Sequence, residues 1–328
     1  MKREQILGKL FEIFILKLVL MSGYKPIDIA DIDQNRIRCN RRRFIEFKGR
    51  GEFHQIDVPV DLIYNPNFTY PIRLLGEVKC YSKPIQKYLI REEIGKMKDI
   101  QENYFVDGKL TLDMRRKRRM EIFAFFSASG FSEESERLAY AHGIKTISYK
   151  NNYCIEELID YIKPLAFKIA KFDNNLQKRV LDDIYDSMIL GKDLYNDDMK
   201  CLKSLPFVKT SIIGTTTTGL IIHFLSFDDF PDNLFREKDY AYCQYHGSNN
   251  GNVWEMTIKN SDSKFYFSMP EIILKESFVK DGNTIFPNKE QEFEIISFMR
   301  EIDGKQRNLE FRFDSDWFRH LTNHHNDK

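Results

Sequence analysis

Apolar residues recur with two different spacings in the N-terminal part of the chain. In GKLFEIFILKLVLMSGY (8–24) they return every three or four positions, which predicts a helix. Gly23 follows directly, where a glycine commonly ends a helix. Two shorter apolar runs, QIDVPVDLI and RLLGEVKCY, lie within residues 51–81. Their length and their β-branched residues predict two strands.

A second block of regular structure is predicted over residues 125–149. The segment FFSASGFSEESERLAYAHGIKTISY has the pattern of a strand, a Gly-Phe-Ser turn, a helix that Gly143 ends, and a further strand. Strands and helices therefore alternate through this part of the chain, and the predicted fold class is α/β.

Helical spacing returns in residues 153–172 and 175–194. Pro164 is expected to interrupt the first helix, and Gly191 to end the second. From about residue 206 β-branched residues dominate, as in FVKTSIIGTTTTGLIIHFLSF, and they predict strands. The pattern predicts three parts: an α/β domain over 1–165, a helical connector over 166–205, and a β-rich α+β domain over 206–328.

Three charged residues interrupt the apolar runs within 51–81. Asp57 lies in the first run, and Glu77 and Lys79 lie in the second. Side chains at positions i and i+2 of a strand share one face, so Glu77 and Lys79 are expected side by side. Charges that point inward from an apolar strand are costly to bury unless they are compensated. A divalent cation between Asp57 and Glu77 would compensate them; the alternative is a surface salt bridge on an edge strand.

The spacing D…ExK, preceded by a GxxFE helix that ends in Gly-Tyr, resembles the Mrr-like branch of the PD-(D/E)xK nuclease superfamily. The pattern of 125–149 follows in the order that this family shows, and the likeness covers roughly the first half of the chain. It departs from the family beside Asp57, where His54 and Gln55 stand in a region that often carries glycines. The resemblance implies a restriction-endonuclease-like core, which is a mixed central sheet flanked by helices.

The resemblance also implies metal-dependent hydrolysis of phosphodiester bonds. Asp57, Glu77 and the backbone carbonyl of Val78 are expected to bind Mg²⁺, with Mn²⁺ as the alternative, because hard oxygen ligands suit these ions. The ion would acidify a bound water and stabilise charge on the phosphate. Lys79 is expected to orient the attacking water or to stabilise the developing charge. Glu12 is expected to reach the ion through water, or else to be a solvated helix charge.

Three further polar residues lie close to Asp57 in the sequence. Gln55 is expected on the same strand face, where it would hydrogen-bond a phosphate or the metal-bound water, and it is counted with the catalytic residues. His54 points to the opposite face of a regular strand and is expected to be structural. Asp61 is expected on the face of Asp57, where it assists the site or, by preference, caps the strand end or a turn.

Charge is distributed unevenly along the chain. Residues 1–160 hold 28 Lys and Arg against 23 Asp and Glu, a balance of +5, and the remainder holds 22 against 26, a balance of −4. Two basic runs, NRIRCNRRRF and MRRKRRM, lie in the first part. Clustered cations bind phosphates without sequence preference, although a solvated loop is the alternative. The residues expected to contact nucleic acid are Arg41, Arg42, Arg43, Arg115, Arg116, Arg118 and Arg119.

Composition narrows the class of protein. Five cysteines without a CxxC pair argue against a zinc ribbon and against a disulfide framework. No apolar run has the length of a membrane span, since the most apolar segment carries Glu12 and Lys17. A cytoplasmic protein without a membrane partner is therefore expected.

These observations predict a cytoplasmic, Mg²⁺-dependent endonuclease of a restriction or defence type that acts on double-stranded DNA. A homodimer is expected, because cleavage of two strands needs two active sites. A structure-specific or RNA-directed nuclease stays open, as does a non-catalytic nucleic-acid-binding module on a nuclease fold. The C-terminal domain is expected to select the target, to dimerise the protein or to sense a signal.

Overall fold

The computed structural model describes residues 1–27, 36–41, 44–65, 67–103, 119–193, 208–247, 254–271 and 294–314. The chain divides into two compact units, Met1–Tyr149 with Ile155–Phe207, and Lys150–Cys154 with Val208–Lys328. The first unit is α/β and the second is a β-barrel, so the predicted change from an α/β to a β-rich pattern is confirmed. Within the described ranges, no helix is both long enough and apolar enough to cross a membrane.

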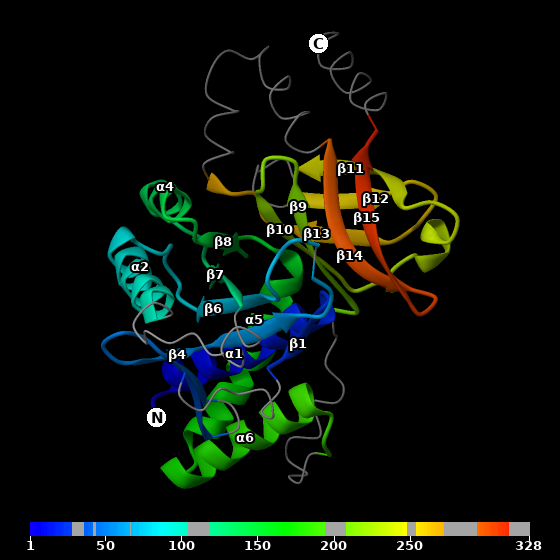
Figure 1. The fold of residues 1–328 in the computed structure, drawn as a ribbon. Coiled ribbons are helices and arrows are strands. Elements are labelled where there is room, and N and C mark those ends of the chain that lie inside the picture. Colours follow the sequence, from blue (N-terminus) through cyan, green and yellow to red (C-terminus); the bar gives the residue numbers. More distant parts are fainter. Residues whose placement is uncertain are drawn as a thin grey trace. The chain divides into compact units, whose positions relative to one another are not determined.

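A mixed five-stranded sheet forms the centre of the first unit (Figure 1), in the order β1-β5-β6-β7-β8. The middle strand, β6, is antiparallel to β5 and parallel to β7. Strand β1 is antiparallel to β5, and β8 is parallel to β7. The bounds are β1 (Tyr24–Pro26), β5 (Val58–Leu62), β6 (Ile72–Lys79), β7 (Met120–Ser127) and β8 (Lys145–Ser148).

Helices cover both faces of this sheet. The helices of this unit are α1 (Arg3–Met21), α2 (Lys87–Glu102), α4 (Glu133–Ala141), α5 (Tyr153–Ala170) and α6 (Asn174–Leu190), of which α6 packs against α1. Phe125 of β7 meets Phe131 edge-on at 5.6 Å between ring centroids, on the face that shares a buried cluster with α2. Phe126 stacks on Tyr149 at 6.4 Å on the other face, and Tyr149 meets Phe11 of α1. Successive residues of β7 thus pack into two separate layers of the core, one on each face of the sheet.

Most of the predicted helix boundaries are confirmed. Gly23, Gly143 and Gly191 follow α1, α4 and α6 with φ of 91°, 75° and 68°, a conformation that glycine adopts without strain. The predicted interruption at Pro164 is wrong, because α5 continues through it. Buried residues on both sides of Pro164 hold the helix in place, which outweighs the backbone hydrogen bond that proline removes. The segment expected as a connector lies within the first unit, where α6 packs against α1.

The run QIDVPVDLI forms two strands, so the single predicted strand is wrong. The first part is β4, which belongs to a separate antiparallel sheet, and the second part is β5 of the central sheet. Asp57 lies in a bend between the two strands and belongs to neither, so the alternation of a single strand does not continue through it. The strands of the separate sheet are β2 (Ile37–Arg41), β3 (Phe44–Lys48) and β4 (Phe53–Ile56).

The second unit is a closed barrel in the order β10-β13-β12-β11-β15-β14-β9. Neighbouring strands are antiparallel, except that β11 and β15 run parallel. Where an α+β fold was expected, the described part of this unit adds to its strands the short 3-10 helix η4 (Asp232–Phe235). The strands are β9 (Thr210–Thr216), β10 (Ile221–Ser226), β11 (Tyr240–Gly247), β12 (Trp254–Ile258), β13 (Lys264–Phe267), β14 (Ile295–Ile302) and β15 (Lys305–Phe313).

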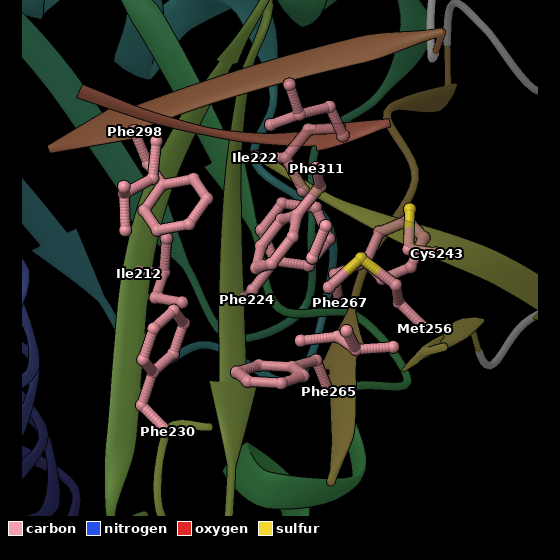
Figure 2. Packing of buried hydrophobic residues seen from close by; sticks show 14 of the residues in the cluster. Ile212, Ile222, Phe224, Phe230, Cys243, Met256, Phe265, Phe267, Phe298 and Phe311 are labelled. Atoms are coloured by element: carbon pink, nitrogen blue, oxygen red, sulfur yellow. The ribbon is translucent and has the colours of Figure 1, made fainter. Parts of the chain in front are cut away.

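Aromatic side chains fill the interior of this barrel (Figure 2). Phe298 and Phe311 lie 4.5 Å apart between ring centroids, and Phe224 lies 5.0 Å from Phe267. Inward-facing residues of a barrel alternate with outward-facing ones, so each strand contributes about every second side chain to this core. The interior of the barrel is therefore a packed hydrophobic core.

Gly76→Ala is expected to destabilise the first unit. A Cβ atom at this position of β6 would lie 2.9 Å from the side chains of both Phe126 and Val58. Overpacking of this kind typically lowers the free energy of unfolding by about 1–3 kcal/mol. Urea unfolding of the full-length protein measures the effect.

Gly95→Ala in α2 is the matched control, because a Cβ atom there meets nothing within 4 Å. Alanine favours a helix over glycine, so this variant should gain about 0.5–1 kcal/mol. Equal stability of Gly76→Ala and the wild type would contradict the close packing at β6.

Candidate active site

Asp57 lies at the bend where the chain leaves β4 and enters β5. Its backbone N–H donates to the carbonyl of Gly76 at 3.1 Å. Its Oδ2 accepts a hydrogen bond from the N–H of Val78, also at 3.1 Å. The Asp57 residue is therefore tied to the backbone of β6 on both sides of Glu77, which brings together the two acids that the sequence singled out.

Both carboxylate oxygens of Glu77 are paired with lysines. Oε1 accepts a hydrogen bond from Lys79, two residues further along β6, and Oε2 accepts one from Lys96 of α2 at 2.7 Å. Lys96 also pairs with Glu93, one turn earlier on α2, at 2.9 Å. The contact between Glu77 and Lys79 is the one that strand alternation predicts, whereas Lys96 and Glu93 were missed.

The sequence did carry a signal for the two missed residues. Glu93 and Lys96 lie at helical spacing among Ile90, Ile94 and Met97, which are buried residues of α2. Charged residues on the apolar stripe of a helix need partners on the element that the stripe faces. The strand predicted to carry Glu77 was one candidate for the element that supplies such partners.

The pair of Glu77 and Lys79 lies on the middle strand of the sheet, with side chains 14% and 23% exposed. The alternative of a surface salt bridge on an edge strand is therefore wrong. Burial acts to lower the pKa of Lys79, but Glu77 and Asp57 outweigh it and raise that pKa. Lys79 is consequently a firmly protonated cation.

Glu12 of α1 belongs to the same group of charges. It accepts two hydrogen bonds from Lys9, at 2.9 and 2.7 Å. Burial and, to a lesser degree, Asp57 raise the pKa of Glu12 to about 7, against the opposing effects of Lys9 and Lys79. Because its side chain is only 18% exposed, Glu12 is not the solvated helix charge that was the alternative.

The other carboxyl groups differ in how well lysines compensate them. Burial raises the pKa of Asp57, and Glu77 adds to this rise. Burial also raises the pKa of Glu93, against the opposing effect of Lys96. For Glu77 burial acts upward too, but Lys96 and Lys79 outweigh it and lower its pKa. Glu77 is thus the best compensated carboxylate of the group.

These residues form one unit, the acid–lysine cluster. Fully ionised, it holds four carboxylates against three ammonium groups, which is a net charge of −1. Among the described residues, no group of three or more His, Cys, Asp and Glu side chains is arranged to hold a metal ion. The members of the cluster are Lys9, Glu12, Asp57, Glu77, Lys79, Glu93 and Lys96.

Gln55 and His54 precede the bend on β4. Gln55 is exposed and lies opposite Glu46 of β3. Its expected position on the face of Asp57 assumed one regular strand, and the bend at Asp57 interrupts that strand. His54 Nε2 lies 2.7 Å from Oδ2 of Asp99, and Oδ1 of Asp99 accepts a hydrogen bond from the N–H of Gly51 at 3.1 Å. His54 thus has the structural role that was expected, with α2 supplying its partner.

Asp61 of β5 is part of a buried ion pair. Its two oxygens accept hydrogen bonds from the guanidinium of Arg73 at 2.6 and 2.9 Å, and Arg73 is the facing residue of β6. The expected capping role of Asp61 is therefore wrong, because a cross-strand partner takes up its carboxylate. Arg119 also lies near this pair, with Nε 3.9 Å from Oδ2 of Asp61 and a side chain 14% exposed.

The basic runs are only partly within the described structure. Arg41 ends β2. Arg119 directs its guanidinium to Asp61, inside the first unit, instead of toward solvent. The other residues of the predicted nucleic-acid contacts lie outside the described ranges: Arg42, Arg43, Arg115, Arg116 and Arg118.

Comparisons with known proteins give no relationship that bears on function. No family model and no curated protein matches the chain. Among solved structures, a crystal structure of a protein of unknown function, AF1548, matches with 14% identity and a TM-score of 0.28. The match covers 57% of this chain and 100% of that one. A likeness at this level carries no argument about fold or activity.

Glu12→Gln is expected to remove a pH-dependent loss of stability. The pKa of Glu12 in the folded protein is about 7, above its ordinary 4.5, so the folded state holds this proton more tightly than the unfolded chain. The stabilisation is complete below pH 4.5 and is lost as the pH rises through 7. Well above that pH the variant should gain up to about 3 kcal/mol over the wild type.

Urea unfolding at several pH values between about 5 and 8 checks this sign and window. Glu134→Gln is the control, since Glu134 is an exposed acid on α4 whose pKa Lys87 lowers. It should retain the wild-type loss of stability with rising pH. The same loss in Glu12→Gln would show that this carboxyl group is not the cause.

Proposed function

We propose that the first unit is a metal-dependent endonuclease of the Mrr-like restriction type, which hydrolyses phosphodiester bonds in double-stranded DNA. The observation that carries the proposal is the acid–lysine cluster, where Asp57, Glu77 and Lys79 meet and Glu12 joins them. A mixed sheet with helices on both faces supports a restriction-endonuclease-like core. The likeness to that family rests on these residues and on their order along the chain.

The oxygen donors of the cluster are of the chemical type that binds Mg²⁺, with Mn²⁺ as the alternative. Carboxylate and carbonyl oxygens are the ligands that Mg²⁺ prefers in proteins. Burial and the neighbouring Glu77 raise the pKa of Asp57, and a divalent cation would instead stabilise the ionised carboxylate. Asp57, Glu77 and the carbonyl of Val78 would hold the ion, with Glu12 acting through water. When bound, the ion supplies an acidified water and charge stabilisation at the phosphate.

Lys79 acts in this proposal as a fixed cation. Its raised pKa makes it a poor general base, because a base must first be deprotonated. It would orient the attacking water and stabilise the charge that develops on the phosphate. The Glu77 contact supports that role, since it holds the ammonium group beside the proposed metal ligands.

The barrel unit would select the target, dimerise the protein or sense a signal. A homodimer follows from the need for two active sites in the cleavage of two strands, and this step rests on analogy with the nuclease fold. The proposed location is the cytoplasm, because the pattern of cysteines does not indicate a disulfide framework.

A second candidate function is a non-catalytic nucleic-acid-binding module on a nuclease fold. It is favoured by the pairing of both Glu77 oxygens with Lys79 and Lys96, which neutralises this carboxylate without an ion. Incubation of a plasmid with Mg²⁺ or with EDTA distinguishes the two. Nicking only with Mg²⁺ supports the endonuclease, and a mobility shift without cleavage supports the module. Cleavage of RNA in place of DNA would support the RNA-directed alternative.

Asp57→Ala, Glu77→Ala and Lys79→Ala are each expected to reduce plasmid cleavage by about 10²-fold or more, the loss typical of a removed charge-stabilising group. The first two remove metal ligands and should weaken Mg²⁺ binding in calorimetry. Lys79→Ala removes no ligand and should mainly slow the chemical step. Circular dichroism checks that each variant is folded.

Glu134→Ala provides the control for these variants, since it removes an exposed acid outside the cluster. It should cleave at the wild-type rate. Wild-type cleavage by all three cluster variants would overturn the assignment of the active site.

Replacement of Arg115, Arg116 and Arg118 by glutamine is expected to weaken DNA binding without a change of sequence preference. Fewer released counterions should flatten the dependence of log K on log salt by about 0.9 for each lost phosphate contact. Binding titrations at several salt concentrations measure this slope. Arg119→Gln is the contrast, because its guanidinium lies by Asp61 and its loss should lower stability instead. An unchanged slope in the triple variant would remove this run from the DNA contacts.

A further inference from the structure

Lys96 is a cation shared between two carboxylates on different elements. Its Nζ lies 2.7 Å from Oε2 of Glu77 on β6 and 2.9 Å from Oε2 of Glu93 on α2. The side chain is 15% exposed. Burial acts to lower the pKa of Lys96, but Glu77 and Glu93 outweigh it and raise that pKa. The ammonium group therefore keeps its charge within the cluster.

Glu93 has hydrogen-bonding capacity that its present contacts do not use. It is 3% exposed, and its Oε1 is buried without a hydrogen-bond partner. An unpaired buried oxygen of this kind is unfavourable. The ammonium group of Lys96 has three N–H donors, so a shift toward Glu93 would supply the missing partner. The cluster thus offers Lys96 a second position, in which it is paired with Glu93 alone.

Lys79 has no equivalent second position among its described partners. Its ion pair is with Glu77, and the next acid that acts on it is Asp57, so both are ligands in the proposed metal site; its weaker effects on Glu12 and Glu93 involve no ion pair among the described residues. Movement of Lys79 would therefore not take its charge away from the ligands. Lys96 alone of the two lysines on Glu77 has an acid on its own helix, one turn away.

We propose that Lys96 is an exchangeable internal cation, which occupies Oε2 of Glu77 until a divalent cation binds there and then withdraws to Glu93. The inference rests on the proposed metal-dependent function. Lys96 is a positioning residue, because it acts through Glu77. Glu93 keeps the withdrawn ammonium group paired, and an unpaired buried charge would otherwise oppose the exchange.

The exchange predicts opposite effects for two substitutions in the full-length protein. Lys96→Met removes the competing cation, so Mg²⁺ should bind about tenfold more tightly or better. Glu93→Gln removes the second position of Lys96, so Mg²⁺ should bind more weakly than to the wild type. Isothermal titration calorimetry with Mg²⁺ alone measures both. A general folding defect would weaken binding in both variants and would not produce this pair of signs.

The double variant Lys96→Met/Glu93→Gln separates exchange from simple electrostatics. If Glu93 acts through Lys96, the double variant should bind Mg²⁺ like Lys96→Met alone. If each charge acts independently on the ion, the two effects should add, and that outcome overturns the exchange. Lys98→Met and Glu92→Gln, at exposed positions of α2, are the controls and should match the wild type.

A Lys96→Met protein that binds Mg²⁺ no more tightly than the wild type also overturns the proposal, as does the absence of Mg²⁺ binding from every variant. Plasmid cleavage by the wild type tests the endonuclease separately. A protein that shows the expected pattern of affinities but cleaves nothing would retain the exchange and lose the proposed function.

Discussion

A carboxylate on the middle strand of a sheet needs compensation from inside the protein, and Glu77 is in that position. The strand itself supplies Lys79, and α2 supplies Lys96. The second of these ion pairs connects α2 to the central sheet beside the buried apolar cluster that both share. A buried charge that loses one partner is strongly destabilising, so α2, β6 and their charges depend on one another.

The bend at Asp57 is the second determinant of the site. It divides an apolar run between two sheets, and it directs the Asp57 carboxylate to the N–H of Val78. A continuous strand would have kept Asp57 in a regular ladder, with Gln55 on its face. The bend brings Asp57 to Glu77 instead, and the cluster gains an acid that burial and its neighbours keep poorly compensated. That imbalance is the physical basis for the proposed cation site.

The two units form their hydrophobic cores in different ways. The α/β unit buries both faces of its sheet against helices, and charges enter the interior only in partnered groups such as Asp61 with Arg73. The barrel unit closes its sheet on itself and fills it with aromatic side chains (Figure 2). Its packed interior leaves the outer surface and the loops of the barrel for any partner. The acid–lysine cluster therefore belongs to the α/β unit.

The sequence by itself determined several of the helices and strands and the proximity of Glu77 and Lys79. Helical and strand periods, with glycines at three helix ends, are local properties, and the i, i+2 contact follows from strand geometry alone. Only the tertiary structure decided that Glu12, Lys96 and Glu93 join the cluster, that α5 continues through Pro164, and that Asp57 lies at a bend. These outcomes depend on burial and on charges brought together by packing, which outweigh local preference and are not encoded in the spacing of any one segment.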